Sequence, residues 1–85
     1  MHFFRIIWDD ENDPDGNVEH ISEHGLTIDD VEHVLLNPTN EGISQSSGLP
    51  VVWGDTPDDR SLIIVYDQVD EGTIRVITAY GVSEP

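Results

Sequence analysis

The first candidate for chemistry is a pair of histidines, His20 and His24, which stand four residues apart. In a helix this spacing places both imidazoles on one face, as in many zinc sites, and His33 or Glu19 could supply a third ligand. The segment lacks the glutamate that follows the first histidine of zinc hydrolases and acts as their base. We therefore predict no metal and no other cofactor, with a site at His20 and His24 as the alternative.

An acidic loop is the second candidate. Residues 11–16 alternate oxygen-bearing side chains and end in glycine, like the first half of a calcium loop. If Glu11 is the first ligand, Ser22 stands where a bidentate glutamate is needed, one residue before Glu23. Pro14 also stiffens a segment that would have to wrap around the ion. We predict a solvated turn, with adventitious calcium binding as the alternative.

Three aromatic residues, Trp53, Tyr66 and Tyr80, fall in segments that read as neighbouring strands. Together they could stack single-stranded bases, but such platforms normally sit within a basic groove. Aromatic residues on neighbouring strands are also typical of a core or a protein interface. The low number of basic residues favours the second interpretation.

Two helices are predicted in the first half of the chain. One begins at Asn17 and ends at Gly25, since glycine readily adopts the left-handed conformation that terminates a helix. The next begins after Thr27, an N-cap with Asp30 three residues on, and stops at residues 37–38, Asn-Pro. The predicted apolar stripe of the second helix consists of Ile28, Val31, Val34 and Leu35.

The remaining segments follow the period of strands. Short turns separate the later ones, which predicts an antiparallel meander, and the run at residues 62–66 is apolar at every position, as in a central strand. The expected class is therefore α+β, with two helices on one face of a mainly antiparallel sheet of four or five strands, in the order β-α-α-β-β-β-β. The predicted strands are residues 3–8, 41–47, 49–54, 61–69 and 73–80.

Length and composition suit one small domain spanning residues 1–85. The chain has no cysteine, which indicates a reducing cytoplasm, and neither a signal peptide nor a membrane-spanning segment is recognisable. Eighteen acidic residues against three arginines give a formal charge of -15. This charge repels phosphate backbones, so we expect no unaided binding to DNA and favour a basic protein partner. The alternative is a surface adapted to concentrated salt.

Three stretches make the chain similar to the BrnT family, the toxins of a type II toxin–antitoxin system. They are Ile7-Trp8-Asp9, His24-Gly25-Leu26-Thr27 and Arg75-Val76-Ile77-Thr78-Ala79. The resemblance spans nearly the whole chain and agrees with the predicted element order. It implies a RelE-like fold and a small, metal-independent ribonuclease that halts translation and is silenced by an antitoxin with a DNA-binding end.

RNA cleavage without a metal requires a base, an acid and cations that stabilise the charge of the transition state. The resemblance assigns such a role to Arg75 in the last strand. Arg60 at the start of the central strand is expected near it across the sheet, and Arg5 is a third candidate. His24 could act as acid or base, because an unperturbed imidazole exchanges its proton near neutral pH. Alternatively, the arginines form ion pairs, and His24 helps to end the helix beside Gly25.

Three hypotheses follow. The chain is a BrnT-like ribonuclease, in which case RNA is a partner; or it is a non-catalytic acidic module that keeps the toxin fold and binds a basic, antitoxin-like protein; or it is an acidic domain whose charge serves only solubility in salt. Arg75, Arg60 and His24 are the predicted catalytic residues under the first hypothesis.

Overall fold

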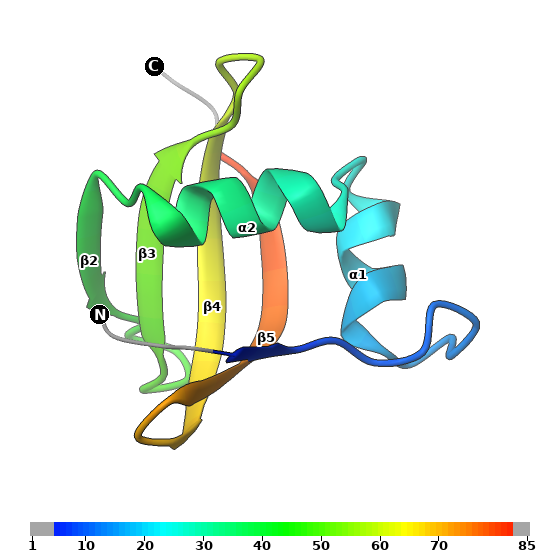
Figure 1. Ribbon diagram of the computed structural model, residues 1–85. Coiled ribbons are helices and arrows are strands. Elements are labelled where there is room, and N and C mark those ends of the chain that lie inside the picture. Colours follow the sequence, from blue (N-terminus) through cyan, green and yellow to red (C-terminus); the bar gives the residue numbers. More distant parts are fainter. Residues whose placement is uncertain (1–4, 83–85) are drawn as a thin grey trace.

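Five strands and two helices make up the computed structural model, which describes residues 5–82 (Figure 1). They follow one another in the predicted order β-α-α-β-β-β-β, and the predicted α+β class is confirmed. The elements are β1 (Arg5–Ile7), α1 (Asn17–Glu23), α2 (Ile28–Leu36), β2 (Asn40–Ile43), β3 (Pro50–Asp55), β4 (Ser61–Asp70) and β5 (Thr73–Gly81).

The strands form one sheet in the order β1-β5-β4-β3-β2. β2 to β5 make the predicted antiparallel meander, and β4 is the central strand, as its continuous apolar run indicates. β1 pairs parallel to β5, so that Ile7 lies beside Arg75. The predicted first strand included residues 3 and 4, which lie outside the described residues, and Trp8, which follows β1.

Local signals explain both helix boundaries between α1 and α2. Gly25 has φ +75°, and the amides of Gly25 and Leu26 donate to the carbonyls of Ser22 and Ile21, which closes α1 in a Schellman motif. The Thr27 hydroxyl then accepts from the amide of Asp30, whose carboxylate accepts from the amide of Thr27. This reciprocal capping box begins α2 where the sequence predicts it.

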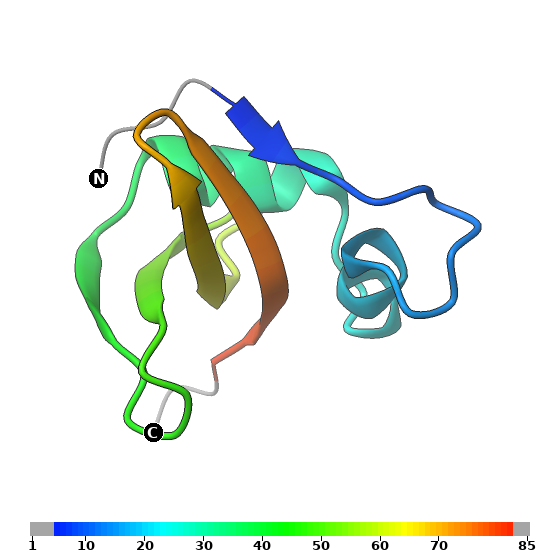
Figure 2. The same cartoon turned by 90° about the horizontal axis from the view of Figure 1, so that it is seen from below.

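Both helices contribute to a core on one side of the sheet. α2 crosses β3 and β4, while α1 packs beside β5 (Figures 1 and 2). α2 approaches β3 closely because Gly54 has no side chain; a Cβ there would lie 2.8 Å from Cγ1 of Val34. The core residues are Ile21, Leu26, Val31, Val34, Leu35, Val52, Leu62, Ile64, Tyr66, Ile74, Val76 and Ala79.

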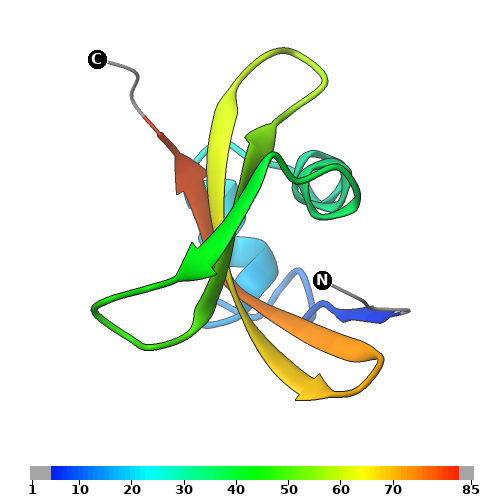
Figure 3. The same ribbon diagram turned by 90° about the vertical axis from the view of Figure 1, so that its left-hand side faces the viewer.

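The opposite face of the sheet is not covered in the same way. Within residues 5–82 both helices lie on one side, and the view along the sheet shows α2 there, with the turn after β2 and the end of β5 on the other (Figure 3). Neither helix of this segment is long and apolar enough to cross a membrane.

Candidate functional site

Arg75, the residue that the resemblance assigns to catalysis, is held by a carboxylate. It lies on β5, and its Nη2 donates to Oδ2 of Asp9 at 2.5 Å. Asp9 also accepts from the backbone amide of Asn17 at 3.0 Å. That amide, assisted by the positive charge of Arg75, holds the pKa of Asp9 below its ordinary value of 3.8. At neutral pH the guanidinium of Arg75 therefore faces an ionised carboxylate.

Asn17 is a buried residue that links the strands and the helix around the ion pair of Arg75 and Asp9, and its sequence position does not reveal this role. Its Oδ1 accepts from the amide of Asp9 at 2.8 Å. Its Nδ2 donates to the carbonyls of Ile7 and Val76, each at 2.9 Å. One side chain thus joins β1, β5 and the start of α1. An asparagine at the start of a helix usually serves as an exposed cap, so its position in the sequence gives no sign of this role.

Arg60 is also engaged by the protein itself. Its guanidinium donates to the carbonyl of Gly25 at 3.1 Å, to Asp30 at 3.0 Å and to Asp58 at 3.1 Å. The bond with Asp58 is the main cause that raises the pKa of Arg60. The Thr56 hydroxyl, followed by Arg60, lowers the pKa of Asp58. Arg60 therefore fastens the turn between β3 and β4 to the loop between the two helices.

The expectation that Arg60 lies near Arg75 is wrong. Arg60 directly precedes β4, whereas Arg75 lies beside Asp67, near the other end of that strand. Seven residues of extended chain separate the two levels, about 23 Å. Arg5, the third candidate, is exposed on β1, where its charge is one of the minor causes that lower the pKa of Asp70. The three arginines thus lie at different places, each near a carboxylate.

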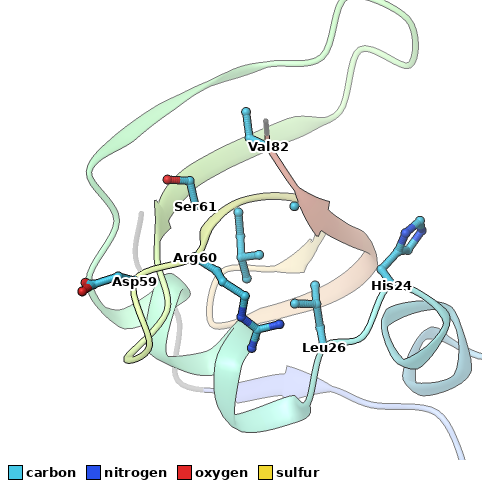
Figure 4. A pocket seen from close by; sticks show the side chains of 8 residues that line it. His24, Leu26, Asp59, Arg60, Ser61 and Val82 are labelled. Atoms are coloured by element: carbon cyan, nitrogen blue, oxygen red, sulfur yellow. The ribbon is translucent and has the colours of Figure 1, made fainter. Parts of the chain in front are cut away.

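His24 is the C-cap of α1 and is exposed. It lines a surface cleft of about 460 Å³ together with Arg60, Leu26 and Ser61. Its ring lies 6.1 Å from that of Tyr80, at a tilt of 50°. Figure 4 shows the imidazole of His24 and the guanidinium of Arg60 on different sides of Leu26, with the imidazole turned outward. The cleft therefore brings two predicted catalytic residues to one place without pairing them.

The two ion-binding alternatives gain no support from the structure. Among residues 5–82, no three side chains of histidine, aspartate or glutamate come together as metal ligands. His20 lies exposed in α1, whereas His24 stands where the helix ends. In the acidic loop, Asp10 and Asp13 accept from the amides two residues further on, at 2.8 and 3.0 Å. These local bonds shape a turn, as the solvated-turn interpretation predicts.

The three aromatic residues do not form one platform. Tyr66 points into the core under the helices, where burial raises the pKa of its hydroxyl. Trp53 and Tyr80 lie on the other face, on either side of Ile63 in the ladder. The platform of Trp53, Tyr66 and Tyr80 is therefore excluded, because adjacent strands place Tyr66 on the opposite side of the sheet from the other two.

The side of the sheet away from the helices carries apolar side chains, which we call the open face and define as Val51, Trp53, Ile63, Val65 and Tyr80. Of these, Val51 is itself buried, at 2% exposed. These residues line a shallow groove of about 360 Å³, with Ile43 of β2 at its edge. Ile43 is 65% exposed and Tyr80 39%. The indole of Trp53 lies over β2, where Gly42 leaves room for it. Residues 62–66, apolar on both faces, are the sequence signal for this surface.

Comparisons of the chain with family models, curated proteins and solved structures find no match.

Proposed function

We propose that this chain is a divergent BrnT-like protein that works as a non-catalytic interaction module and binds a basic protein partner. The observation that supports the proposal most is that the guanidinium groups that a phosphate would need already form ion pairs with carboxylates of the protein. Asp9 holds Arg75, while Asp58 and Asp30 hold Arg60. RNA would have to displace these carboxylates and approach a chain of formal charge -15.

The element order β-α-α-β-β-β-β agrees with the resemblance to the toxin family, and so does the position of its middle motif. His24, Gly25, Leu26 and Thr27 close α1 and open α2, so this motif has a structural role that needs no catalysis. A protein can keep this fold and this capping motif after it has lost a cationic catalytic site. The support for a non-catalytic module therefore comes from the ion pairs and the net charge, and not from the fold.

A comparison of the binding of a basic peptide and of RNA tests the proposal. Fluorescence anisotropy would compare a labelled arginine-rich peptide with a labelled single-stranded RNA of equal length, at about 50 and 300 mM NaCl. We expect the peptide to bind and to weaken at the higher salt concentration, because exposed charges are then screened. RNA binding without peptide binding would overturn the proposal.

A ribonuclease is the second candidate function, and the surface cleft that contains His24 and Arg60 is the observation that supports it. His24 could move a proton and Arg60 could stabilise negative charge there, with Tyr80 beside the imidazole. Purified protein would be incubated with total RNA, with and without ribosomes, at low and high salt. Our proposal expects no cleavage in any condition.

Variants show whether any observed cleavage belongs to the protein. Cleavage that disappears in His24→Gln, or in an Arg75→Ala variant with an unchanged circular dichroism spectrum, would establish the ribonuclease instead. The spectrum matters because Arg75 also forms an ion pair with Asp9, so its loss could weaken the fold. Glu11→Gln in the exposed acidic loop is the matched control.

A further inference from the structure

No helix of the described chain covers the open face, although its Val51 is buried and residues 44 and 45 of the turn after β2 line one side of its groove. A sheet of a small domain is stable when apolar side chains on each face are buried against another element, and here the helices bury one face only. Ile63 and Val65 of the central strand remain half-buried, between Trp53 and Val51 of β3 on one side and Tyr80 and Thr78 of β5 on the other. A contiguous apolar surface of this kind marks an interaction site in soluble proteins.

Carboxylates flank the open face at both ends. On β3, Asp55 follows Val51 and Trp53 at the next position of the same face, and on β4, Asp67 follows Ile63 and Val65 in the same way. Asp55 lies beside Ser61, six residues from Asp67, which is about 20 Å of extended strand. An occupant of this face therefore meets apolar side chains in the middle and negative charge at each end.

The positive charge nearest to this surface does not cancel those carboxylates. Arg75 lies across the ladder from Asp67, but its guanidinium donates to Asp9 at 2.5 Å. Two carboxylates and one guanidinium thus gather at that end. At the other end Asp55 accepts from the hydroxyl of Ser61 at 2.9 Å, a bond that leaves its charge in place. Charge complementarity calls for cations at both ends of the occupant.

A second copy of the chain is a poor occupant of this surface. It would bring another formal charge of -15 and would set the flanking carboxylates against its own. An added strand fits little better. Among the described residues, β2 forms one edge of the sheet, and residues 76–81 of β5, which β1 does not reach, form part of the other. A strand paired at either edge would extend the sheet sideways and would leave Trp53, Ile63 and Val65 uncovered.

Building on the proposed function, we propose that the open face binds an amphipathic basic helix of a protein partner. Apolar residues of that helix, spaced i, i+3, i+4 and i+7, cover Trp53, Ile63 and Val65. Lysine or arginine residues near its two ends face Asp55 and Asp67. In a helix that lies along the strands, a span of about 20 Å corresponds to about 13 residues.

A designed peptide tests this mode of binding. The peptide has about 18 residues, leucines at the helical spacing and arginines near each end, and its control has the same composition in scrambled order. The protein has two tryptophans, so Trp8→Phe leaves Trp53 as the reporter. We expect the helical peptide to shift the emission of Trp53 to shorter wavelength and to bind at least about tenfold more tightly than the scrambled one.

Variants of the protein localise the contact. Ile63→Thr with Val65→Thr keeps β-branched residues in the strand and should weaken binding by about tenfold or more. Leu36→Ser, at a leucine that is 70% exposed at the end of α2, is the matched control and should change nothing. Asp55→Asn with Asp67→Asn should weaken binding several-fold at low salt, whereas Glu11→Gln with Asp15→Asn in the acidic loop should not.

Each result decides between the two proposals. Equal binding of helical and scrambled peptides, unaffected by the open-face variants, would overturn this inference and leave the basic-partner function standing. Failure of every basic peptide to bind would overturn both. Sedimentation showing a dimer that dissociates in Ile63→Thr with Val65→Thr would assign the surface to a second copy. If Trp8→Phe does not fold, amide chemical shifts of the wild-type protein provide the same readout at β3 and β4.

Discussion

Asn17 is the single polar side chain on which the junction of β1, β5 and α1 depends. It is 2% exposed and satisfies three backbone groups, two carbonyls and one amide. When one partner of a buried hydrogen bond is removed, the other polar group stays buried without a partner, and its loss of hydration is no longer compensated. The junction is therefore far more sensitive to this residue than its small size suggests.

We expect Asn17→Ala to lower the free energy of unfolding by about 2–4 kcal/mol, because the carbonyls of Ile7 and Val76 lose their donor. Urea denaturation measures the change. Asn12→Ala, at an exposed asparagine of the acidic loop, is the control and should stay within about 0.5 kcal/mol of the wild type. Equal effects of the two substitutions would contradict the structural role of Asn17.

Asp9 makes a defined contribution to the pH dependence of stability. Its pKa is lowered from 3.8 in the folded protein, first by the amide of Asn17 and then by Arg75. A lowered pKa means that the folded state prefers the ionised carboxylate. This contribution is fully present above the ordinary pKa of 3.8 that the unfolded state has, and it disappears as the pH falls through the lower pKa of the folded state.

Asp9→Asn removes this contribution. The difference in unfolding free energy between wild type and variant should be constant above about pH 5 and should shrink as the pH falls toward 3 and below. Asp15→Asn, in the exposed loop, serves as the control for the loss of one negative charge. A difference that grows on acidification would contradict the pairing of Asp9 with Arg75.

At the scale of elements, the contact between α2 and β3 is set by one glycine. A Cβ at Gly54 would lie 2.8 Å from Val34 and 3.4 Å from the carbonyl of Asn37, so α2 would have to move away from the sheet. Gly81 of β5 offers a matched comparison, since the nearest atom to its Cβ would be the carbonyl of Ser61 at 4.0 Å. Both glycines lie in strands, so their propensities are alike.

Gly54→Ala should therefore lower the free energy of unfolding by about 1–3 kcal/mol, as expected for an overpacked core, while Gly81→Ala should be neutral or slightly stabilising. Thermal unfolding followed by circular dichroism measures both. Val34→Ala in the Gly54→Ala background should recover part of the loss by making room for the new methyl group. If the double variant shows only the sum of two losses, the close approach is not the cause.

For the whole molecule, the formal charge of -15 opposes folding through repulsion among exposed carboxylates. Raising NaCl from about 0.1 to 1 M shortens the Debye length from about 10 to about 3 Å. We expect the melting temperature to rise, by about 4–8 °C for each kcal/mol gained in a domain of this size. Differential scanning calorimetry measures it, and a fall in melting temperature would show that the surface ion pairs dominate instead.

The salt dependence of stability, combined with a peptide titration, separates the remaining hypotheses. A domain whose charge serves only solubility in salt gains stability on adding NaCl but binds no basic peptide at any salt concentration. An interaction module also gains stability, and it binds the peptide at low salt. Stability alone therefore does not distinguish them, and the titration with peptide has to accompany the calorimetry.

Local chemistry explains which parts of the fold were predictable. The end of α1 at Gly25 and the capping box between Thr27 and Asp30 are each decided within a few residues of chain, so the sequence indicates both. The central position of β4 follows from its apolar residues alone. One contact of α2 lies outside its predicted apolar stripe: Glu32 is half-buried and accepts a hydrogen bond from the indole of Trp8 at 3.3 Å.

The faces of β5 show where sequence reasoning fails. Strict alternation would place residues 76, 78 and 80 on one side, yet Val76 and Ala79 both face the core and Tyr80 faces away. A register shift between Val65 and Tyr66 of β4 changes the alternation opposite residues 76–78. A bulge depends on how two strands pair, which no single segment encodes.

The amino-acid sequence by itself determined the acidity of this protein, its α+β order and the caps of its helices, because composition and contacts between near neighbours decide them. Only the tertiary structure decided the role of its charges. Arg75 meets Asp9 from 66 positions away, and Arg60 meets Gly25 and Asp30 from 35 and 30 positions away. Such partners are determined by the packing of distant elements, and this packing also places both helices on the side of the sheet away from the open face.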